Sequence, residues 1–268
     1  MDKMTGADTY SSLRDVLRNR IVTIGGWMQI GHPAIAEIFS NAGFNWIAVD
    51  GEHTDISIES FSNIARAMHG RRSAPIMRVR ENDTLAIRQA LDVGAMGVII
   101  PLVNTAEEAQ KAVAAARYSP EGIRGYAFCR ANNWGIDFDE YVKSANDEIA
   151  VIVMIESKQA VENIDDILGV EGVDGIFVGP YDLSGSYGVT GQISHPLIEN
   201  ALKIISEACK KHGRSAGLHA VLPTEQIIRK AIQDGFTFIA LGMDTIFLNE
   251  CAREVIQITK MAKLNEEG

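Results

Sequence analysis

The chain has 268 residues, of which 46% are hydrophobic and 22% charged, so it can bury one large core and is expected to form a single domain over residues 1–268. Its 25 Lys and Arg against 35 Asp and Glu leave a formal net charge of −10, which argues against a nucleic-acid partner. No apolar stretch approaches the length of about 20 residues that spans a membrane, and the polar first residues are unlike a signal segment. Cys129, Cys209 and Cys251 lack the close spacing of a zinc site and indicate the reduced thiols of a cytoplasmic protein.

Short apolar runs alternate with segments of helical spacing along the chain, which is the pattern of repeated β/α units. The segments between the runs have apolar residues at i, i+3 and i+4, and several end in Gly, as helices often do. The expected strands are 21–27, 46–51, 74–79, 97–103, 150–156, 175–180, 215–220 and 236–243. Eight strands in about 250 residues predict an α/β fold, a (β/α)8 or TIM barrel.

Two segments bear on this prediction. A doubly wound open sheet would also alternate strands and helices, but it needs a Gly-rich phosphate-binding turn after the first strand. Gly25-Gly26 is a poor match to that turn and suits a tight strand end. Residues 118–148 form a long insertion rich in Gly, Arg, Asn and aromatic residues, and long ordered loops in compact domains usually carry function.

Polar side chains gather at the expected carboxyl ends of the strands, where TIM barrels hold their active sites. Acids, histidines and guanidinium groups would converge there. In chain order these residues are Trp27, Gln29, Asp50, Glu52, His53, Arg78, Arg80, Glu156, Asp182, His219 and Asp244.

Most of these residues also have a structural explanation. Asp182 and Asp244 could be only helix N-caps, and His53 alone could be an ordinary surface or core histidine. Arg78 is different, because a guanidinium inside an apolar strand must find an anion or backbone carbonyls to offset its desolvation. Taken together, the residues favour a functional site.

Glu156 and Asp182 end two neighbouring expected strands, in VIVMIE and GIFVGPYD, and form the pair that best suits a hard divalent cation. Such a cation can polarise a carbonyl group and stabilise an enolate. An arginine can neutralise an oxyanion and a histidine can move protons, so these parts describe enolate chemistry on a 2-keto acid. The other route to an aldolase is a Schiff-base lysine, and Lys158 is the lysine close to a strand end, although its position suits the start of a helix.

Longer motifs cover most of the chain, namely AGFNWIAVDGEHTDIS, PIMRVREND, IRQALDVGAMGVIIPLVNTAEEA, RYSPEGIRGYAFCRANNWG and IESKQAVENIDDILGVEGVDGIFVGPYDLSGSYG. From about Gly25 to Asp244 they closely resemble the HpcH/HpaI aldolase family. The resemblance implies a TIM barrel of the phosphoenolpyruvate/pyruvate type and a class II aldolase that uses Mg2+, Mn2+ or Co2+. Such enzymes cleave 4-hydroxy-2-keto acids, such as 2-keto-3-deoxy sugar acids or hydroxy-ketodiacids, to pyruvate and an aldehyde.

The resemblance also implies roles for the site residues. By matched position, Glu156 and Asp182 would be the metal ligands, and Arg78 would stabilise the enolate oxygen. His53 would act as the base, directly or through water, with Asp92 raising its basicity. The substrate would be bound by Trp27, Gly179, Tyr181 through its backbone amide, Asp182 and Arg130, with Asp50, Glu52 and Arg124 around them.

An oligomer is implied as well. Members of the family are commonly hexamers, trimers of dimers in which terminal helices exchange between subunits. Here this concerns an N-terminal extension over 1–20 and a C-terminal helix over 244–268. Asp92 ends the helix after the third strand, on the face opposite to the catalytic ends, so it is either a helix-end residue or acts across a subunit interface. The resemblance implies the second.

Some positions depart from the family pattern. Met154 stands where the best-known aldolases of the family have a glutamine, Asn132-Asn133 replaces a small or basic pair, and His219 lies near the expected mouth. These changes indicate a different aldehyde. Decarboxylating or citrate-forming condensations on oxaloacetate through the same enolate remain an alternative, and so does a non-catalytic barrel that only binds carboxylates.

Overall fold

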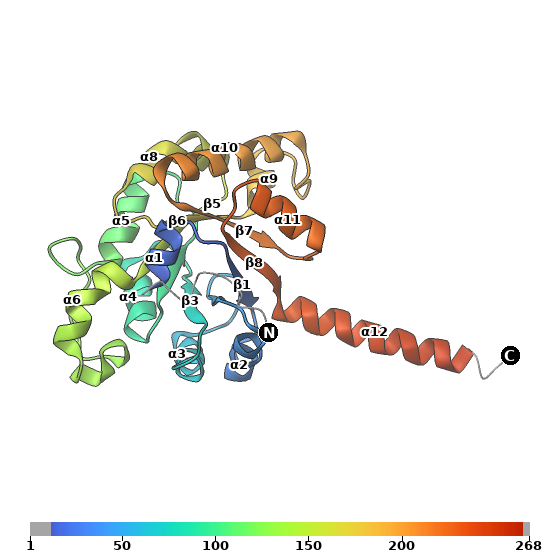
Figure 1. Cartoon of the computed structure of the whole chain (residues 1–268), viewed down its shortest axis with the longest axis horizontal. Helices are drawn as coiled ribbons and strands as arrows, with labels where there is room; N and C mark the ends of the chain where they lie inside the picture. The colour runs from blue at the N-terminus through green and yellow to red at the C-terminus, as the bar shows by residue number, and fades with distance from the viewer. Residues whose placement is uncertain (1–11, 265–268) are drawn as a thin grey trace.

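The computed structural model describes residues 12–264, with side chains described up to residue 259, and shows a closed barrel of eight parallel strands. Each strand pairs with the next along the chain, and β1 pairs with β8 to close the ring. The strands are β1 (Thr23–Met28), β2 (Trp46–Asp50), β3 (Ala74–Arg78), β4 (Gly97–Ile100), β5 (Ala150–Ile155), β6 (Gly175–Val178), β7 (Ser215–Ala220) and β8 (Phe238–Met243). The predicted strands and the TIM barrel are confirmed (Figure 1).

Helices alternate with the strands and surround the barrel (Figure 1). They are α1 (Leu13–Arg18), α2 (Pro33–Ala42), α3 (Ile58–Ala67), α4 (Thr84–Asp92), α5 (Ala106–Ala116), the 3-10 segment η2 (Arg130–Gly135), α6 (Phe138–Glu148), α7 (Lys158–Glu162), α8 (Ile164–Gly169), α9 (Pro180–Ser186), α10 (Pro196–His212), α11 (Glu225–Gln233) and α12 (Asp244–Leu264). None of these helices, over the part of the chain that the structure describes, is long and apolar enough to cross a membrane.

Short polar side chains determine where several helices begin. The side chains of Ser57, Asp83 and Thr105 each accept a hydrogen bond from a backbone amide in the first turn of the helix that follows. Gly43 and Gly213 end α2 and α10 in the left-handed conformation, as glycines commonly do after a helix. The local sequence therefore sets the ends of these helices, and with them the loops that join helices to strands.

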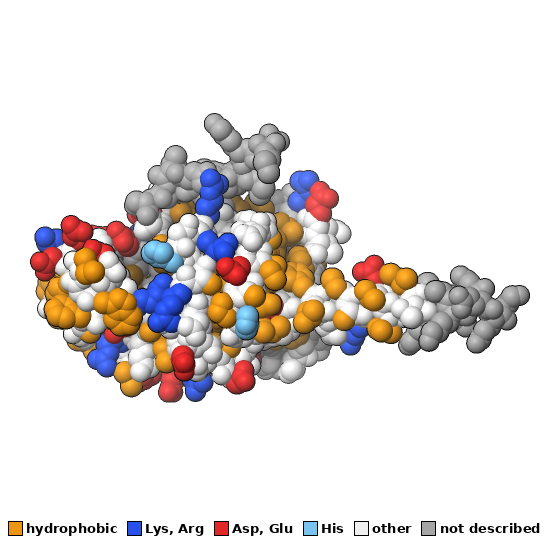
Figure 2. Space-filling view, turned by 90° about the horizontal axis from the view of Figure 1, so that it is seen from below, with side chains coloured by type: hydrophobic (Ala, Val, Ile, Leu, Met, Phe, Trp, Pro, Cys, Tyr) orange, Lys and Arg blue, Asp and Glu red, His pale blue; other side chains and the backbone are white. Residues whose placement is uncertain are grey.

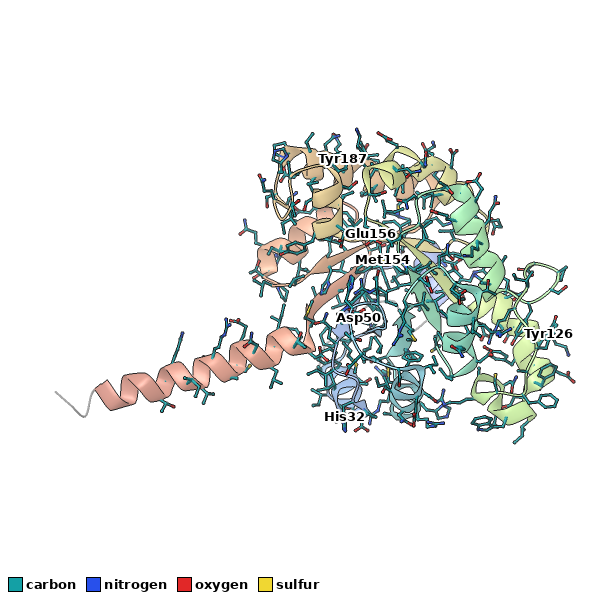
Figure 3. All side chains as sticks on the ribbon, turned by 180° about the vertical axis from the view of Figure 1, so that it is seen from behind. His32, Asp50, Tyr126, Met154, Glu156 and Tyr187 are labelled. Carbon is teal, nitrogen blue, oxygen red and sulfur yellow. The ribbon has the colours of Figure 1, made fainter. Side chains whose placement is uncertain are left out.

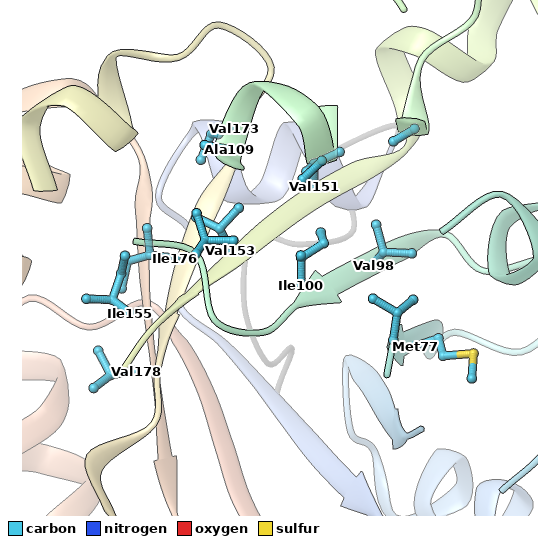
Figure 4. Close-up of a cluster of buried hydrophobic side chains, with 14 of the residues drawn as sticks. Met77, Val98, Ile100, Ala109, Val151, Val153, Ile155, Val173, Ile176 and Val178 are labelled. Carbon is cyan, nitrogen blue, oxygen red and sulfur yellow. The ribbon is translucent and has the colours of Figure 1, made fainter. Parts of the chain in front are cut away.

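The barrel has two separate hydrophobic cores. The larger core lies between the strands and the surrounding helices, and it includes Val151, Val153 and Ile155 of β5 (Figure 4). The smaller core fills the barrel interior and includes Ile152 and Met154 of the same strand. Successive side chains of a strand point to opposite faces, so alternate residues of β5 belong to alternate cores.

The short helix α1 closes the barrel at the amino ends of the strands. Leu13 and Leu17 of this helix belong to the interior core. The guanidinium groups of Arg14 and Arg18 donate hydrogen bonds to the buried carboxylate of Asp174, at 2.8 and 2.9 Å. Residues 13–18 are therefore packed into the barrel, while residues 1–11 of the expected N-terminal extension lie outside the described residues.

Among the described residues, the insertion after α5 and the helix α12 both carry exposed apolar side chains. The insertion after α5, which contains η2 and α6, presents Tyr126, Phe128 and Trp134 with 53%, 72% and 65% exposure. The helix α12 extends away from the barrel and presents Leu248 and Ile258 (Figure 1). Figure 2 shows hydrophobic side chains at the end of the molecule opposite α12 and along α12 itself.

Candidate active site

The alternation of the strands directs three candidate side chains into the barrel mouth. Asp50, Arg78 and Glu156 each stand two residues beyond a side chain of the interior core, namely Ala48, Ile76 and Met154. Figure 3 shows Asp50, Met154 and Glu156 inside the ring of strands, whereas Tyr126 and Tyr187 lie at the periphery. The fold therefore gathers residues that are far apart in the sequence at the carboxyl ends of the strands.

A buried ion pair joins β2 to β3. Arg78 Nε and Nη2 donate to Asp50 Oδ1 and Oδ2 at 3.0 and 2.6 Å, so the arginine has found the anion that its buried position requires. Burial alone would raise the pKa of Asp50, but the hydrogen bonds and charge of Arg78 hold that pKa below its ordinary value. The third guanidinium nitrogen, Nη1, lies 2.9 Å from Glu52 Oε2. The positive charge of Arg78 is thus fixed between two carboxylates.

Glu52 and His53 follow β2 at the mouth. Their backbone amides both donate to Asp50 Oδ1 at 3.1 Å. Burial raises the pKa of Glu52, and its Oε2 has no aligned hydrogen bond although Arg78 lies close to it. His53 Nε2 is 3.9 Å from the same oxygen, and the imidazole is 62% exposed. The loop therefore presents an accessible histidine next to a partly buried carboxylate.

The candidate metal ligands are Glu156 and Asp182, and the negative charge of Asp182 acts on the Glu156 carboxylate. Glu156 is buried, and its Oε1 accepts a hydrogen bond from the Leu102 amide at 2.7 Å. Burial raises the pKa of Glu156, the Leu102 amide lowers it, and the negative charges of Glu52 and Asp182 raise it. Asp182 belongs to the first turn of α9, whose N-cap is Gly179, so the N-cap explanation of Asp182 is wrong.

Gly179 gives the Glu156 carboxylate its space. A Cβ atom added to Gly179 would lie 2.8 Å from Glu156 Oε2, which is shorter than real Cβ contacts. The same atom would lie 3.5 Å from Met154 Cε. A side chain at position 179 would therefore displace the carboxylate, and Met154 places an apolar group beside it.

An aromatic wall lines one side of the site. The Trp27 ring stacks on Phe177 and on His219, with centroid distances of 5.3 and 5.2 Å, and the Arg78 guanidinium lies 5.0 Å from its centroid. His219 Nε2 is 2.9 Å from the Gly242 carbonyl, so this nitrogen carries the proton. Burial lowers the pKa of His219, which favours the neutral imidazole.

The charge balance of the mouth suits a cation. Asp50, Glu52, Glu156 and Asp182 interact electrostatically with one another or with Arg78, and a single arginine does not neutralise four carboxylates. Carboxylate oxygens are the ligands that Mg2+ and Mn2+ prefer. Within the described residues, no group of three or more His, Cys, Asp and Glu side chains is arranged for a metal ion. The residues fit a cation that one or two carboxylates hold while water and substrate complete its coordination, as is usual for Mg2+.

Three candidate residues lie away from the mouth. Asp92 ends α4, and its Oδ1 accepts a hydrogen bond from Arg124 at 2.9 Å. Arg130 donates to two backbone carbonyls at the C-terminal ends of α4 and α3, at 2.9 and 3.0 Å. Because barrel helices run back toward the amino ends of the strands, all three lie at the opposite end from His53. Within one chain the structure does not bring them to the mouth.

Other candidates have structural positions. The Asp244 carboxylate accepts the backbone amides of Gln29 and Ile30 at 2.9 and 2.8 Å, so it fastens the start of α12 to the loop after β1. Lys158 begins α7 as expected, is 59% exposed and lies 3.7 Å from Glu162. Such an exposed helical position does not suit a Schiff-base lysine, which is activated by desolvation or a neighbouring cation.

The loop after β4 is not recognisable from the sequence as part of the site, because it offers no acidic or basic side chain. Its contribution is the backbone amide of Leu102, which binds Glu156. The signal in the sequence is Pro101 inside the expected strand 97–103, since a proline cannot continue a central strand, and the strand in fact ends at Ile100.

Comparisons with known proteins show which proteins this chain resembles. A protein named 5-keto-4-deoxy-D-glucarate aldolase, from Escherichia coli O139:H28 (strain E24377A / ETEC), is 41% identical over 235 residues, which cover 87% of this chain and 91% of that protein. An HpcH/HpaI aldolase/citrate lyase family protein from Burkholderia cenocepacia J2315 has a similar solved structure, with a TM-score of 0.87 and 32% identity over 92% of this chain and 98% of that one. The citrate synthase SbnG has a TM-score of 0.83 and 30% identity over 94% of this chain and 98% of its own.

The family match covers nearly the whole barrel. A family model described as HpcH/HpaI aldolase/citrate lyase matches residues 23–250. The expected family is confirmed, and the name of the Escherichia coli relative agrees with the expected aldolase, a carbon-carbon lyase. The chain belongs to the HpcH/HpaI aldolase/citrate lyase family.

Proposed function

We propose that this protein is a divalent-metal-dependent aldolase that cleaves a 4-hydroxy-2-keto acid into pyruvate and an aldehyde. The observation that carries the proposal is the excess of carboxylates around Arg78 at the barrel mouth, with an accessible histidine beside them. The relative named 5-keto-4-deoxy-D-glucarate aldolase supports a sugar-acid substrate. Such a substrate would break between its deoxy carbon and the adjacent hydroxylated carbon, giving pyruvate and a short hydroxy-aldehyde acid.

Glu156 and Asp182 would hold the cation, which we expect to be Mg2+, Mn2+ or Co2+. When bound, this cation supplies Lewis acidity that polarises the keto group and stabilises the enolate. Arg78 adds a fixed positive charge for the enolate oxygen, because its ion pair with Asp50 holds the guanidinium in place before the substrate arrives.

The chain's own residues move the proton. In the cleavage direction His53, directly or through water, takes the proton of the 4-hydroxyl group, whose oxygen becomes the aldehyde carbonyl. The electrons of the bond between carbons 3 and 4 pass into the enolate of pyruvate, and a proton returned to carbon 3 completes the methyl group. The exposure of His53 at the mouth supports this role.

Residues around the mouth would bind the substrate. Trp27 provides an aromatic wall, and Gly179 leaves room next to Glu156. The substrate carboxylate would bind at the Tyr181 amide and next to Asp182 in the first turn of α9, where backbone amides have no partner inside the helix. Arg130 would contribute from a neighbouring subunit.

We infer a homo-oligomer, a hexamer built as a trimer of dimers, in which Asp92 of one subunit assists His53 of the next. The position of Asp92 at the end of the barrel opposite to His53 supports this arrangement, as do the exposed apolar side chains of the insertion and α12. The three cysteines are free thiols, which supports a cytoplasmic location.

The test is a coupled assay of pyruvate release from 5-keto-4-deoxy-D-glucarate and other 4-hydroxy-2-keto acids, with Mn2+ or EDTA and with borohydride. We expect turnover with Mn2+, loss of turnover with EDTA, and no inactivation by borohydride. Metal-independent turnover that borohydride abolishes would instead indicate a Schiff-base enzyme.

A citrate-forming condensation on oxaloacetate is the second candidate, since the citrate synthase SbnG is 30% identical. It would use the same enolate site. Citrate formation from oxaloacetate and a two-carbon acetyl donor such as an acetyl thioester, with no pyruvate release from any hydroxy-keto acid, would favour this candidate. A barrel that only binds carboxylates would show neither product, and replacing His53 would leave its ligand binding unchanged.

A further inference from the structure

The loop between β4 and α5 holds Glu156 through an unusual backbone conformation. Leu102 has a φ of 55°, in the left-handed region that leucine rarely adopts. In this conformation its N–H points at Glu156 Oε1, at 2.7 Å. The Leu102 side chain is 62% exposed, so packing of that side chain does not explain the conformation. The hydrogen bond to Glu156 is the interaction that the strained backbone makes possible.

Asn104 fastens this loop in place. Its Nδ2 donates to the Leu102 carbonyl at 3.1 Å, and its Oδ1 accepts the hydroxyl of Ser157, the residue that follows Glu156. Its backbone amide donates to Glu108 Oε2 at 2.6 Å. One asparagine therefore links the left-handed residue, the helix after the loop and the strand end that carries Glu156.

The two oxygens of Glu156 have different surroundings. Oε1 is taken by the Leu102 amide, whereas Oε2 faces Gly179, the residue at which a Cβ atom would lie 2.8 Å away. The two oxygens of a carboxylate are equivalent, so the hydrogen bond fixes the orientation of the group and not the identity of the bound oxygen. The loop thus holds one oxygen and directs the other toward Gly179.

We propose that Asn104 and Leu102 are positioning residues for the cation site: Asn104 holds Leu102 in the left-handed conformation, and the Leu102 amide orients Glu156 so that Oε2 alone binds the divalent ion. This rests on the proposed function, in which Glu156 is a ligand. Replacing groups that orient a metal ligand typically weakens metal binding by about 10- to 100-fold, so the effect is measurable.

Mn2+ binding, followed by the electron paramagnetic resonance signal of the free ion, tests the proposal without relying on turnover. We expect Asn104→Ala to raise the Mn2+ dissociation constant by about tenfold or more. Leu102→Asn in the Asn104→Ala background should restore much of the affinity, since asparagine adopts the left-handed conformation more readily than leucine. Leu102→Val should weaken binding, because a β-branched residue is disfavoured there.

The matched control is Asn82→Ala. Asn82 lies in the loop after β3 and donates to the Glu108 carbonyl at 2.8 Å, so it is a bonded loop asparagine that makes no hydrogen bond of its own to Leu102, Asn104 or Glu156. This variant should bind Mn2+ like the unaltered protein, while thermal unfolding of each variant reports any general loss of stability. Equal Mn2+ affinity in Asn104→Ala and Asn82→Ala would overturn the proposal.

Glu156→Gln separates this inference from the proposed function. If Glu156→Gln binds Mn2+ as tightly as the unaltered protein, Glu156 is not a ligand and both ideas fail. If Glu156→Gln loses Mn2+ while Asn104→Ala keeps it, the ligand role stands and the positioning role of the loop fails.

Discussion

Asp50, which pairs with Arg78, contributes both to the stability of the fold and to the geometry of the site. Asp50 is fully buried and binds Arg78 through both carboxylate oxygens. Its side chain also accepts the amides of Glu52 and His53. The same carboxylate therefore aligns the guanidinium and shapes the loop that carries the candidate base.

We expect Asp50→Asn to lower the free energy of unfolding by about 3–5 kcal/mol, because Arg78 would lose its buried anion. The pKa of Asp50 in the folded protein is below its ordinary value of 3.8, so its contribution is fully present above that pH. The contribution is lost as the pH falls toward the lower folded pKa. Urea unfolding at neutral pH and near pH 3 should therefore show a difference between the two proteins that shrinks with acidity.

The control is Asp165→Asn. Hydrogen bonds from Lys211 and His212 lower the pKa of Asp165, but Asp165 lies on the surface. Its replacement should have a small effect that added salt removes. Equal effects of Asp50→Asn and Asp165→Asn would contradict the importance of the buried pair.

Gly179→Ala should damage the metal site while leaving the fold intact. The added methyl group would meet Glu156 Oε2 at 2.8 Å, so the carboxylate must move. Isothermal titration with Mn2+ should show weaker binding by about tenfold or more. Gly185→Ala is a close control, because a Cβ at Gly185 meets only Thr190 Oγ1 at 3.8 Å. Unchanged Mn2+ binding in Gly179→Ala would show that this space is not needed.

At the residue scale, much of the site followed from position along the strands. The alternation that places Met154 inside the barrel also places Glu156 there, and the same holds for Arg78 after Ile76. Leu102 could not be predicted in this way, since its contribution comes from a backbone amide and a left-handed φ, and no side-chain chemistry announces either.

At the scale of elements, α1 is an example of a short helix with a large structural role. Its six residues would be unstable as an isolated helix, so tertiary contacts hold it. Leu17 enters the interior core, and the Ser215 hydroxyl donates to its carbonyl at 2.8 Å. Arg117 Nη2 also donates a hydrogen bond to Oδ2 of the buried Asp174, at 3.1 Å.

We expect Leu17→Ala to lower the free energy of unfolding by about 2–5 kcal/mol, since it removes a fully buried side chain from the interior core. Chemical denaturation followed by circular dichroism measures this change. Leu248→Ala, at a leucine that is 63% exposed, should have a much smaller effect in the monomer and serves as control. Similar losses in both variants would mean that α1 does not support the barrel.

The strands were predictable because each is a buried apolar run that ends at a change of composition. From the sequence, the insertion over 118–148 is recognisable only as a long segment, and no pattern in it predicts its internal structure. Asn133 and Trp134 have φ values of 52° and 58°, and the Asn132 side chain organises this turn by binding the Cys129 and Gly135 amides. Such local hydrogen bonds leave no periodic pattern in the sequence, so they cannot be predicted from it.

At the scale of the whole molecule, the chain presents two halves of the proposed site at opposite ends. His53 and Arg78 lie at the carboxyl ends of the strands, and Asp92 lies at the amino ends beside Arg124. The Arg124 guanidinium is held 4.6 Å from the Tyr118 ring and 5.5 Å from the Tyr141 ring. The sequence predicts that Asp92 lies far from His53, because Asp92 ends a helix. The sequence of one chain does not predict the subunit interface that would bring Asp92 close to His53.

Mixing two defective variants tests this arrangement. His53→Ala and Asp92→Asn should each lower the rate of pyruvate release, by about 100-fold or more for His53→Ala, because the base is impaired. After the two are dissociated and reassembled together, some sites would combine an intact His53 with an intact Asp92 from the neighbour. The mixture should then exceed the sum of the separate activities. No gain, in assemblies shown to contain both variants, would place Asp92 outside the site.

Trp27 in the aromatic wall allows ligand binding to be followed by the intrinsic fluorescence of the protein. The three tryptophans have different surroundings, since Trp134 is 65% exposed, Trp46 is fully buried against Phe238, and Trp27 lies at the mouth beside Arg78. An aqueous quencher such as iodide should suppress mainly the emission of Trp134. The remaining fluorescence would then respond to ligands through Trp27, so occupancy of the mouth could be followed without a label or a coupled enzyme.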